Sequence, residues 1–330
     1  MRKISYAQAI NEAFHQVMAN DDRVFQIGVG INTPWYVGNT MKGLLDSFGE
    51  TRMIDTPVSE NGITGISVGS ALTGMRPILT FPRMDFMYYA MDQICNHAAI
   101  LNYTFGGNVS IPLTIRAIIN RGGEQAAQHS QALQALFMHV PGLKIVMPSN
   151  AFDAKGLLIE AVEDDNPVLY IEDRWLYDEE MEVPEEDYRV PIGQAKLVRE
   201  GTDITIVSYS YMMVECQKAI VELTKQGINP ELIDLRSIKP MDITTIIHSL
   251  KKTGRLLIVD GGWKTGGVAA EIAALVADEG FALLKTPVKR LTLPDLPAPS
   301  SKTLEKIYYP THVEIIKGCQ DIIHDKQNVH

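Results

Sequence analysis

The chain has 330 residues, which is long enough for two domains that each bury a core of their own. Hydrophobic residues make up 45% of it and charged residues 21%, a balance typical of globular proteins. The formal net charge of −10 argues against a surface that binds nucleic acid or an anionic membrane, since both require basic patches.

The three cysteines, Cys95, Cys216 and Cys319, lie far apart in the sequence and form no Cys-x-x-Cys pair. This spacing favours reduced thiols over a disulfide framework or a zinc site. The N-terminal residues lead directly into a capping box, Ser5 to Gln8, without the features of a signal peptide. No apolar run is long enough to cross a bilayer, so we expect a soluble, cytoplasmic protein.

Strand-like and helix-like segments alternate through the first half of the chain. Residues 5–18 carry apolar side chains at helical spacing, and residues 111–119 are too apolar to alternate, as expected of a strand covered on both faces. Further strands are expected over 23–28, 52–54, 76–81, 143–147 and 167–171, and further helices near 41–48, 85–99 and 150–162. This alternation predicts a parallel sheet with right-handed crossovers.

The composition changes after the last of these strands. Residues 178–187 are acidic and interrupted by proline, which predicts a solvated linker. A second alternating set follows, with strands expected over 203–208, 230–235, 255–260 and 287–292, and helices over 213–223, from 242, after 267 and from about 311. The expected fold class is therefore α/β with two parallel-sheet domains, over 1–185 and 201–330, joined by a linker over 186–200.

The stretch from Asp55 to Glu60 stands out because a short apolar strand stops at Pro57 and a glycine-rich helix follows. Ser59 is suited to be the N-cap of that helix, which puts Glu60 in its first turn. The carboxyl end of a strand is where open α/β sheets bind ligands, so Glu60 is a candidate functional acid. The alternative is an acid that only stabilises the N-terminus of its own helix.

Other conspicuous residues are weaker signals when each is taken alone. The glycine-rich loop over 261–267 fits neither a P-loop nor a dinucleotide-binding fingerprint, and we interpret it as a tight turn between a strand and a helix. His129 is more often a capping or hydrogen-bonded polar residue. Phe86 and Tyr89 could line a cofactor pocket, but aromatic residues at this spacing more often pack in a core.

Taken together, these motifs resemble one family in their order and spacing. The segments that carry the resemblance are DTPVSENGITGISVGSALTGMRP, MDQICNHAA, AAQHSQ, HVPGLKIVMPSN, DDNPVLYIED and RLLIVDGGWKTGGVAAEIAA. They are similar to the β subunits of the thiamin diphosphate-dependent 2-oxo acid dehydrogenases of the pyruvate, branched-chain and acetoin types, which are related to the C-terminal part of transketolase. The resemblance extends from about Ile4 to His312 and implies a transketolase-like pyrimidine-binding domain followed by a transketolase C-terminal-like domain.

The resemblance also implies roles for particular side chains. Glu60 matches the acid that bonds to the pyrimidine N1′ nitrogen of thiamin diphosphate. An acid there favours the imino tautomer, whose 4′ nitrogen takes the proton from thiazolium C2 and so activates the cofactor. Phe86 and Tyr89 match the wall of the pyrimidine pocket. His129 matches an active-site histidine that donates a proton or anchors the substrate carboxylate.

Further cofactors and partners follow from the same resemblance. Some members hold a structural potassium ion on backbone carbonyl groups, and the matching residues here are Leu113, Ala161, Val162, Asp164 and Asn166. The chain lacks the GDG…N segment that carries magnesium and the diphosphate, which a separate α subunit supplies in this family. The expected assembly is an α2β2 heterotetramer with the active site at an α–β interface, and the acyl unit passes to a lipoyl acyltransferase.

The chain departs from the family pattern after its first strand, where Gly28, Val29 and Gly30 stand in place of the acid that many relatives carry. It also departs over 116–122, where relatives have an Arg-x-Pro-x-Gly loop. Because such an acid can relay protons or handle the second substrate, an alternative is non-oxidative transfer of a two-carbon unit to a sugar or another carbonyl acceptor. A further alternative is a non-catalytic paralogue that only scaffolds an α partner.

Overall fold

The structure, a computed structural model, describes residues 2–122 and 125–324 and divides into two compact units. Unit 1 comprises Met1–Arg121 and Gln128–Ile192, and unit 2 comprises Gly122–Ala127 and Gly193–His330. The division after Ile192 falls inside the range 186–200, which was predicted as a linker. The domain bounds 1–185 and 201–330 stay a prediction. Within the described residues, none of the helices combines the length and the hydropathy that crossing a lipid bilayer requires.

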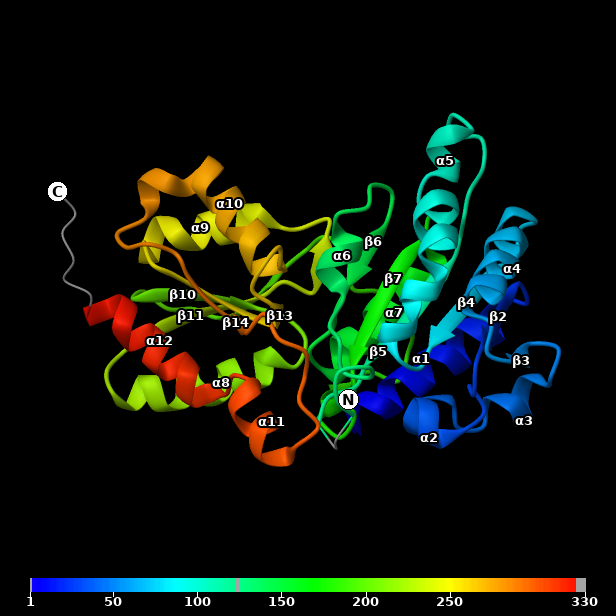
Figure 1. The fold of residues 1–330 in the computed structure, drawn as a ribbon, viewed down its shortest axis with the longest axis horizontal. Helices are drawn as coiled ribbons and strands as arrows, with labels where there is room; N and C mark the ends of the chain where they lie inside the picture. The colour runs from blue at the N-terminus through cyan, green and yellow to red at the C-terminus, as the bar shows by residue number, and fades with distance from the viewer. Residues whose placement is uncertain (1, 123–124, 325–330) are drawn as a thin grey trace. The chain divides into compact units, whose positions relative to one another are not determined.

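The sheet of unit 1 is parallel, and its strands lie in the order β6-β7-β5-β4-β2-β3 (Figure 1). The strands are β2 (Val24–Gly28), β3 (Met53–Asp55), β4 (Arg76–Phe81), β5 (Thr114–Ile119), β6 (Lys144–Val146) and β7 (Val168–Asp173). All residues of β2, β5 and β7 are buried, as the long apolar runs predict. Strand β5 begins later than predicted, because Pro112 has no N–H to donate to the ladder.

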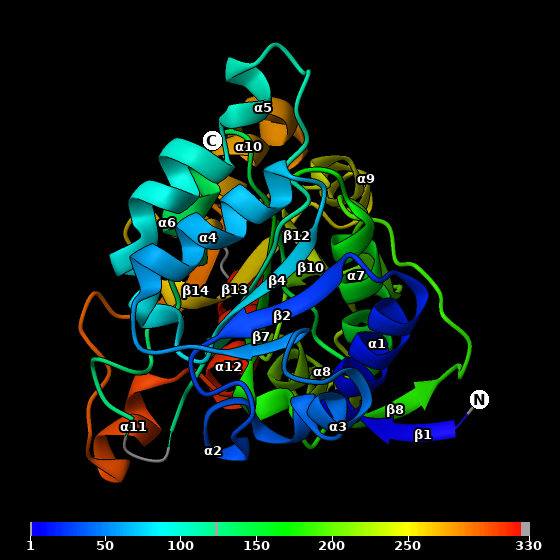
Figure 2. The ribbon, with the colours of Figure 1, turned by 90° about the vertical axis from the view of Figure 1, so that its right-hand side faces the viewer.

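Helices cover both faces of this sheet. Helix α4 (Glu60–Leu72) lies on one face, and α1 (Tyr6–Asn20) and α7 (Ala151–Glu163) pack together on the other (Figure 2). The capping box predicted at Ser5 is confirmed, since its hydroxyl accepts the N–H of Gln8 and the Gln8 side chain accepts the N–H of Ser5. Shorter helices are α2 (Pro34–Val37), η1 (Gly38–Met41), α3 (Leu44–Phe48), α5 (Leu101–Thr104), α6 (Gln134–Met138) and η4 (Arg174–Leu176).

The helix predicted over 85–99 is present, but it is not a regular α-helix. The segment instead forms a 3-10 helix, η2 (Met84–Ala90), followed by a π-helix, η3 (Gln93–Ala98). Met84, Met87 and Ala90 are buried at every third position, which is the period of a 3-10 helix. The segment therefore follows the surface against which it packs, which includes α4, β4 and β5.

The acidic stretch predicted as a solvated linker is partly an ordered strand. Strand β8 (Glu180–Val183) pairs antiparallel with β1 (Arg2–Ser5). The buried Lys155 ammonium then holds the stretch that follows, because it donates hydrogen bonds to three successive carbonyl groups, those of Pro184, Glu185 and Glu186. The acidic composition fits a strand with three of its four side chains exposed, so composition alone misled the prediction.

Unit 2 contains a second sheet, with the strand order β14-β13-β10-β11-β9. Of these strands, only β9, which lies inside the predicted linker, runs antiparallel to its neighbour. Helices α8 and α12 lie on one face and α9 and α10 on the other (Figure 1). The elements of this unit are β9 (Lys196–Arg199), β10 (Ile204–Ser208), α8 (Met212–Lys225), β11 (Pro230–Asp234), β12 (Ser237–Lys239), α9 (Ile243–Thr253), β13 (Leu256–Trp263), α10 (Val268–Gly280), η5 (Phe281–Leu283), β14 (Lys289–Leu293), α11 (Lys302–Tyr308) and α12 (His312–His324).

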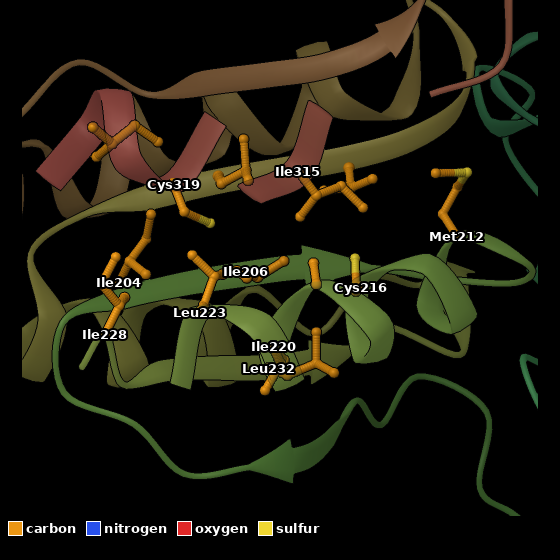
Figure 3. Close-up of a cluster of buried hydrophobic side chains, with 14 of the residues drawn as sticks. Ile204, Ile206, Met212, Cys216, Ile220, Leu223, Ile228, Leu232, Ile315 and Cys319 are labelled. Atoms are coloured by element: carbon orange, nitrogen blue, oxygen red, sulfur yellow. The ribbon is translucent and has the colours of Figure 1, made fainter. Parts of the chain in front are cut away.

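A buried apolar cluster from β10, α8 and α12 forms part of the core of unit 2 (Figure 3). Cys216 and Cys319 both belong to it, and all three cysteines of the chain are free, as predicted. The turn predicted over 261–267 is shorter than expected, because β13 continues to Trp263.

Candidate active site

The carboxyl ends of the central strands of unit 1 meet at one edge of the sheet. The register pairs Gly28 with Asp55 and with Thr80, and Ile119 with Asp173, so the segments that follow these strands begin side by side. A side chain at Gly28 would not fit, because its Cβ would lie 2.5 Å from the backbone oxygen of Thr80. Close packing at this edge therefore requires glycine at the end of β2.

Glu60 is the first residue of α4, as predicted. Its side chain is partly exposed, and within the part of the chain that the structure describes its carboxylate has no hydrogen-bond or ion-pair partner. Ser59 is the N-cap residue by position, but its side chain makes no capping hydrogen bond. The start of α4 thus presents a carboxylate that is available to a ligand.

Phe86 and His129 lie together, although one comes from η2 and the other from the loop after β5. Their rings meet edge to face, with centroids 5.6 Å apart and planes at 88°. Both side chains are half-buried. His129 lies in a turn rather than at a helix start, because α6 begins only at Gln134. Tyr89, on the same segment as Phe86, is 70% exposed.

Asp85 connects the two segments and was missed by the reasoning from sequence. One of its carboxylate oxygens accepts the backbone N–H of Gln131 at 3.1 Å, which ties η2 to the loop that carries His129. Burial raises the pKa of Asp85, while the hydrogen bond from Gln131 opposes the change. The signal available in the sequence was an acid shortly after the end of a buried strand.

Glu60 is not joined to this pair by any hydrogen bond or ring contact within the described ranges. The connection is indirect, because α4 packs against η2. These side chains fit the chemistry of the aminopyrimidine ring of thiamin diphosphate. An unpartnered carboxylate can exchange a proton with a ring nitrogen, and accessible aromatic rings on a neighbouring segment can contact the flat ring. The roles assigned to Glu60, Phe86, Tyr89 and His129 stay predictions.

A buried ion pair supports the strands beneath the site. Arg116 on β5 and Glu172 on β7 are both fully buried, and the guanidinium donates to both carboxylate oxygens. Thr40 accepts a further hydrogen bond from Arg116 at 2.6 Å, and the Tyr177 hydroxyl donates to Glu172 at 2.8 Å. Burial disfavours the charged guanidinium, but Glu172 outweighs this effect, so the pKa of Arg116 is raised above its ordinary value.

Most of the backbone carbonyl groups predicted to hold potassium already accept hydrogen bonds within the chain. One nitrogen of Arg76 donates to the carbonyl of Val162 at 3.0 Å and to that of Asp164 at 3.1 Å. The carbonyls of Ala161 and Leu113 also accept hydrogen bonds, so four of the five predicted carbonyl groups are already engaged. A carbonyl oxygen has two lone pairs, so a potassium ion here would share ligands with Arg76.

No cluster of three or more His, Cys, Asp or Glu side chains suited to a metal ion occurs in the described ranges. This result does not test the potassium site, because that site would use backbone carbonyl groups rather than these side chains. The potassium site stays a prediction.

Two family models match the chain. The model described as the transketolase pyrimidine binding domain matches residues 2–179, and that described as the transketolase C-terminal domain matches residues 193–315. The β subunit of acetoin:2,6-dichlorophenolindophenol oxidoreductase from Bacillus subtilis is 42% identical over 334 residues, covering 98% of each chain. The β subunit of the pyruvate dehydrogenase E1 component from Gracilaria tenuistipitata is 42% identical over 325 residues, covering 98% of this chain and all of the relative.

Among solved structures, a split gene transketolase described as an inactive beta4 tetramer has a similar fold. The TM-score is 0.79, the sequence identity is 20%, and the match covers 98% of this chain and 99% of that one. At this level of identity the likeness concerns the fold alone, which agrees with the predicted arrangement of two transketolase-like α/β domains.

Proposed function

The chain belongs to the transketolase-like family of thiamin diphosphate-dependent enzyme components, and we propose that it is the β subunit of a 2-oxo acid dehydrogenase that uses a pyruvate-like or acetoin-like substrate. Relatives of both kinds match it at 42% identity over nearly their full length. The observation that carries the proposal is the carboxylate of Glu60, at the start of α4 and without a partner among the described residues.

In this proposal the side chains of unit 1 hold and orient the reacting groups. Thiamin diphosphate, when bound, supplies an electron sink for cleavage next to a carbonyl group. Glu60 would hold a proton at the pyrimidine N1′ nitrogen, and Phe86 and Tyr89 would contact the ring. His129 would donate a proton to the substrate or hydrogen-bond to its carboxylate. The edge contact with Phe86 and the Asp85–Gln131 hydrogen bond would limit how far the His129 ring can move.

A partner chain forms the second part of the proposal. The sequence has no GDG segment for magnesium and the diphosphate, so an α subunit would supply these contacts in an α2β2 heterotetramer. The surface around the start of α4 is consistent with a docking face: Val58 is 75% exposed, Ile66 60% and Tyr89 70%. Exposed apolar side chains gathered in one region commonly mark an interface. The proposed assembly is cytoplasmic and passes its acyl unit to a lipoyl acyltransferase.

The proposal is tested by purifying the chain with the α chain that its genome encodes and measuring decarboxylation of pyruvate and cleavage of acetoin. The matched variants are Glu60→Gln and Glu50→Gln, because Glu50 is an exposed residue of the turn between α3 and β3, outside the candidate site. We expect turnover to require both chains and to be lost in Glu60→Gln but not in Glu50→Gln. Tight cofactor binding and turnover by this chain alone would contradict the proposed division of labour.

The acceptor distinguishes the two catalytic alternatives. Lipoamide as the preferred acceptor supports the dehydrogenase, whereas a sugar or another carbonyl acceptor supports non-oxidative transfer of a two-carbon unit. Val29, in place of an acid at the end of β2, is the feature that keeps the second alternative open. Absence of any thiamin-dependent turnover with the natural partner would favour a scaffolding paralogue.

A further inference from the structure

Two arginines lie at the carboxyl edge of the unit 1 sheet without a carboxylate partner among the described residues. Arg83 follows β4 and Arg174 follows β7. Their guanidinium groups are linked through Asn120: Arg174 donates to its amide oxygen at 2.9 Å, and its amide nitrogen donates to the carbonyl of Pro82 at 3.0 Å. Arg83 donates to the same Pro82 carbonyl at 2.8 Å. The two guanidinium groups are thus connected by hydrogen bonds through the Asn120 side chain and the Pro82 carbonyl.

The first of these arginines is buried and incompletely bonded. Arg83 is only 6% exposed, and its Nε–H has no hydrogen-bond partner. Burial, and after it the charge of Arg174, lowers the pKa of Arg83. The charge of Asp85 offsets only part of this effect, since the pKa of Arg83 stays lowered. A buried N–H without an acceptor is costly, so an anion that accepted the Nε–H of Arg83 would relieve both the desolvation and the repulsion.

The position of this pair connects it to the candidate active site. Arg83 stands two residues before Asp85, which holds the loop of His129 through Gln131. The other arginine borders an exposed aromatic rim, since Arg174 donates to the backbone carbonyls of Trp35 and Tyr36. All of these groups belong to unit 1.

We propose that Arg83 and Arg174 bind an anionic group of the substrate, a carboxylate or a phosphate that is remote from the reacting carbon. Guanidinium groups suit this task because their N–H donors match both anions in geometry. The inference rests on the proposed function for its choice of ligand, and it narrows the pyruvate-like or acetoin-like substrates to those that carry an anionic group remote from the reacting carbon.

The first test measures binding on the purified chain and needs no turnover. Inorganic phosphate is titrated against sodium chloride of equal ionic strength, and the unfolding midpoint is recorded for the wild type, Arg83→Gln and Arg189→Gln. The control arginine is exposed and paired with Glu163 and Asp187. We expect phosphate to raise the midpoint of the wild type and of Arg189→Gln but not of Arg83→Gln. Equal phosphate stabilisation in all three proteins would overturn the proposal.

The second test uses the enzyme with its α partner and compares substrates in pairs. One arm compares a dicarboxylic 2-oxo acid with pyruvate as donor, and the other compares glyceraldehyde 3-phosphate with glyceraldehyde as acceptor. Arg83→Gln should lower kcat/KM for the doubly charged member of one pair by about 10- to 100-fold and leave its uncharged or singly charged counterpart within about twofold.

The arm that responds identifies the anion as a carboxylate or a phosphate. Equal losses for both members of each pair would refute the site, and Arg174→Gln, at a half-buried position, repeats the test if Arg83→Gln does not fold. If no substrate is turned over by the wild type, the proposed function fails, whereas the phosphate titration still decides whether the anion site exists.

Discussion

Replacing Arg116 by methionine should destabilise unit 1 severely, because among the described residues it leaves the buried Glu172 carboxylate with the Tyr177 hydroxyl as its one remaining partner. Removing one member of a buried ion pair typically costs about 3–5 kcal/mol.

The assay is thermal unfolding followed by circular dichroism. For a unit of this size, a loss of about 3–5 kcal/mol lowers Tm by about 6–20 °C. The matched control is Arg189→Met, whose pair with Glu163 has side chains 38% and 49% exposed, and exposed pairs contribute about 0–1 kcal/mol. The double variant Arg116→Met/Glu172→Leu should recover most of the loss, because it leaves neither charge buried.

The reasoning is refuted if Arg116→Met lowers Tm no more than Arg189→Met does, or if the double variant recovers none of the loss.

Three further predictions concern single residues. Val29→Glu should be tolerated, because the side chain is only half-buried, with a change of less than about 1 kcal/mol in the free energy of unfolding measured in urea; a larger loss would contradict this. Burial raises the pKa of the Cys216 thiol, and it raises that of Cys319 to about 12, so mass spectrometry after labelling at pH 8 should find both unmodified in the native protein, with Cys95 labelled first. Potassium at ten times its dissociation constant should raise Tm by about 3–6 °C relative to the same concentration of sodium. Equal Tm values in the two salts would contradict the potassium site and leave the carbonyl groups of Val162 and Asp164 bonded to Arg76 alone.

Much of the fold could be predicted from sequence because its strands and helices differ sharply in pattern. The buried strand over Thr114–Ile119 and the capping box at Ser5 are local signals, and both are present in the structure. The segment after Asp85 misled the prediction because its apolar residues also match an α-helical spacing over short distances. Strand β8 was missed because its partner, β1, is far away in the sequence, and the composition of a segment does not indicate such long-range pairing.

The candidate site also combines residues that local sequence predicts with residues that depend on distant contacts. The position of Glu60 at the start of α4 follows from Pro57 and Ser59, which act on neighbouring backbone. The contact of Phe86 with His129 depends on two segments far apart in the sequence, so only the family resemblance suggested that they belong to one site. Arg83 and Arg174 gave no signal at all, because single arginines after strands are common and their shared bridge through Asn120 exists only in three dimensions.

The ribbon formed by β1 and β8 has a consequence for how the protein is made. Arg2 is held opposite Val183, so β1 cannot pair with β8 until almost all of unit 1 has been synthesised. During that interval the edge of β1 is unprotected, and it becomes covered only when translation of unit 1 is nearly finished.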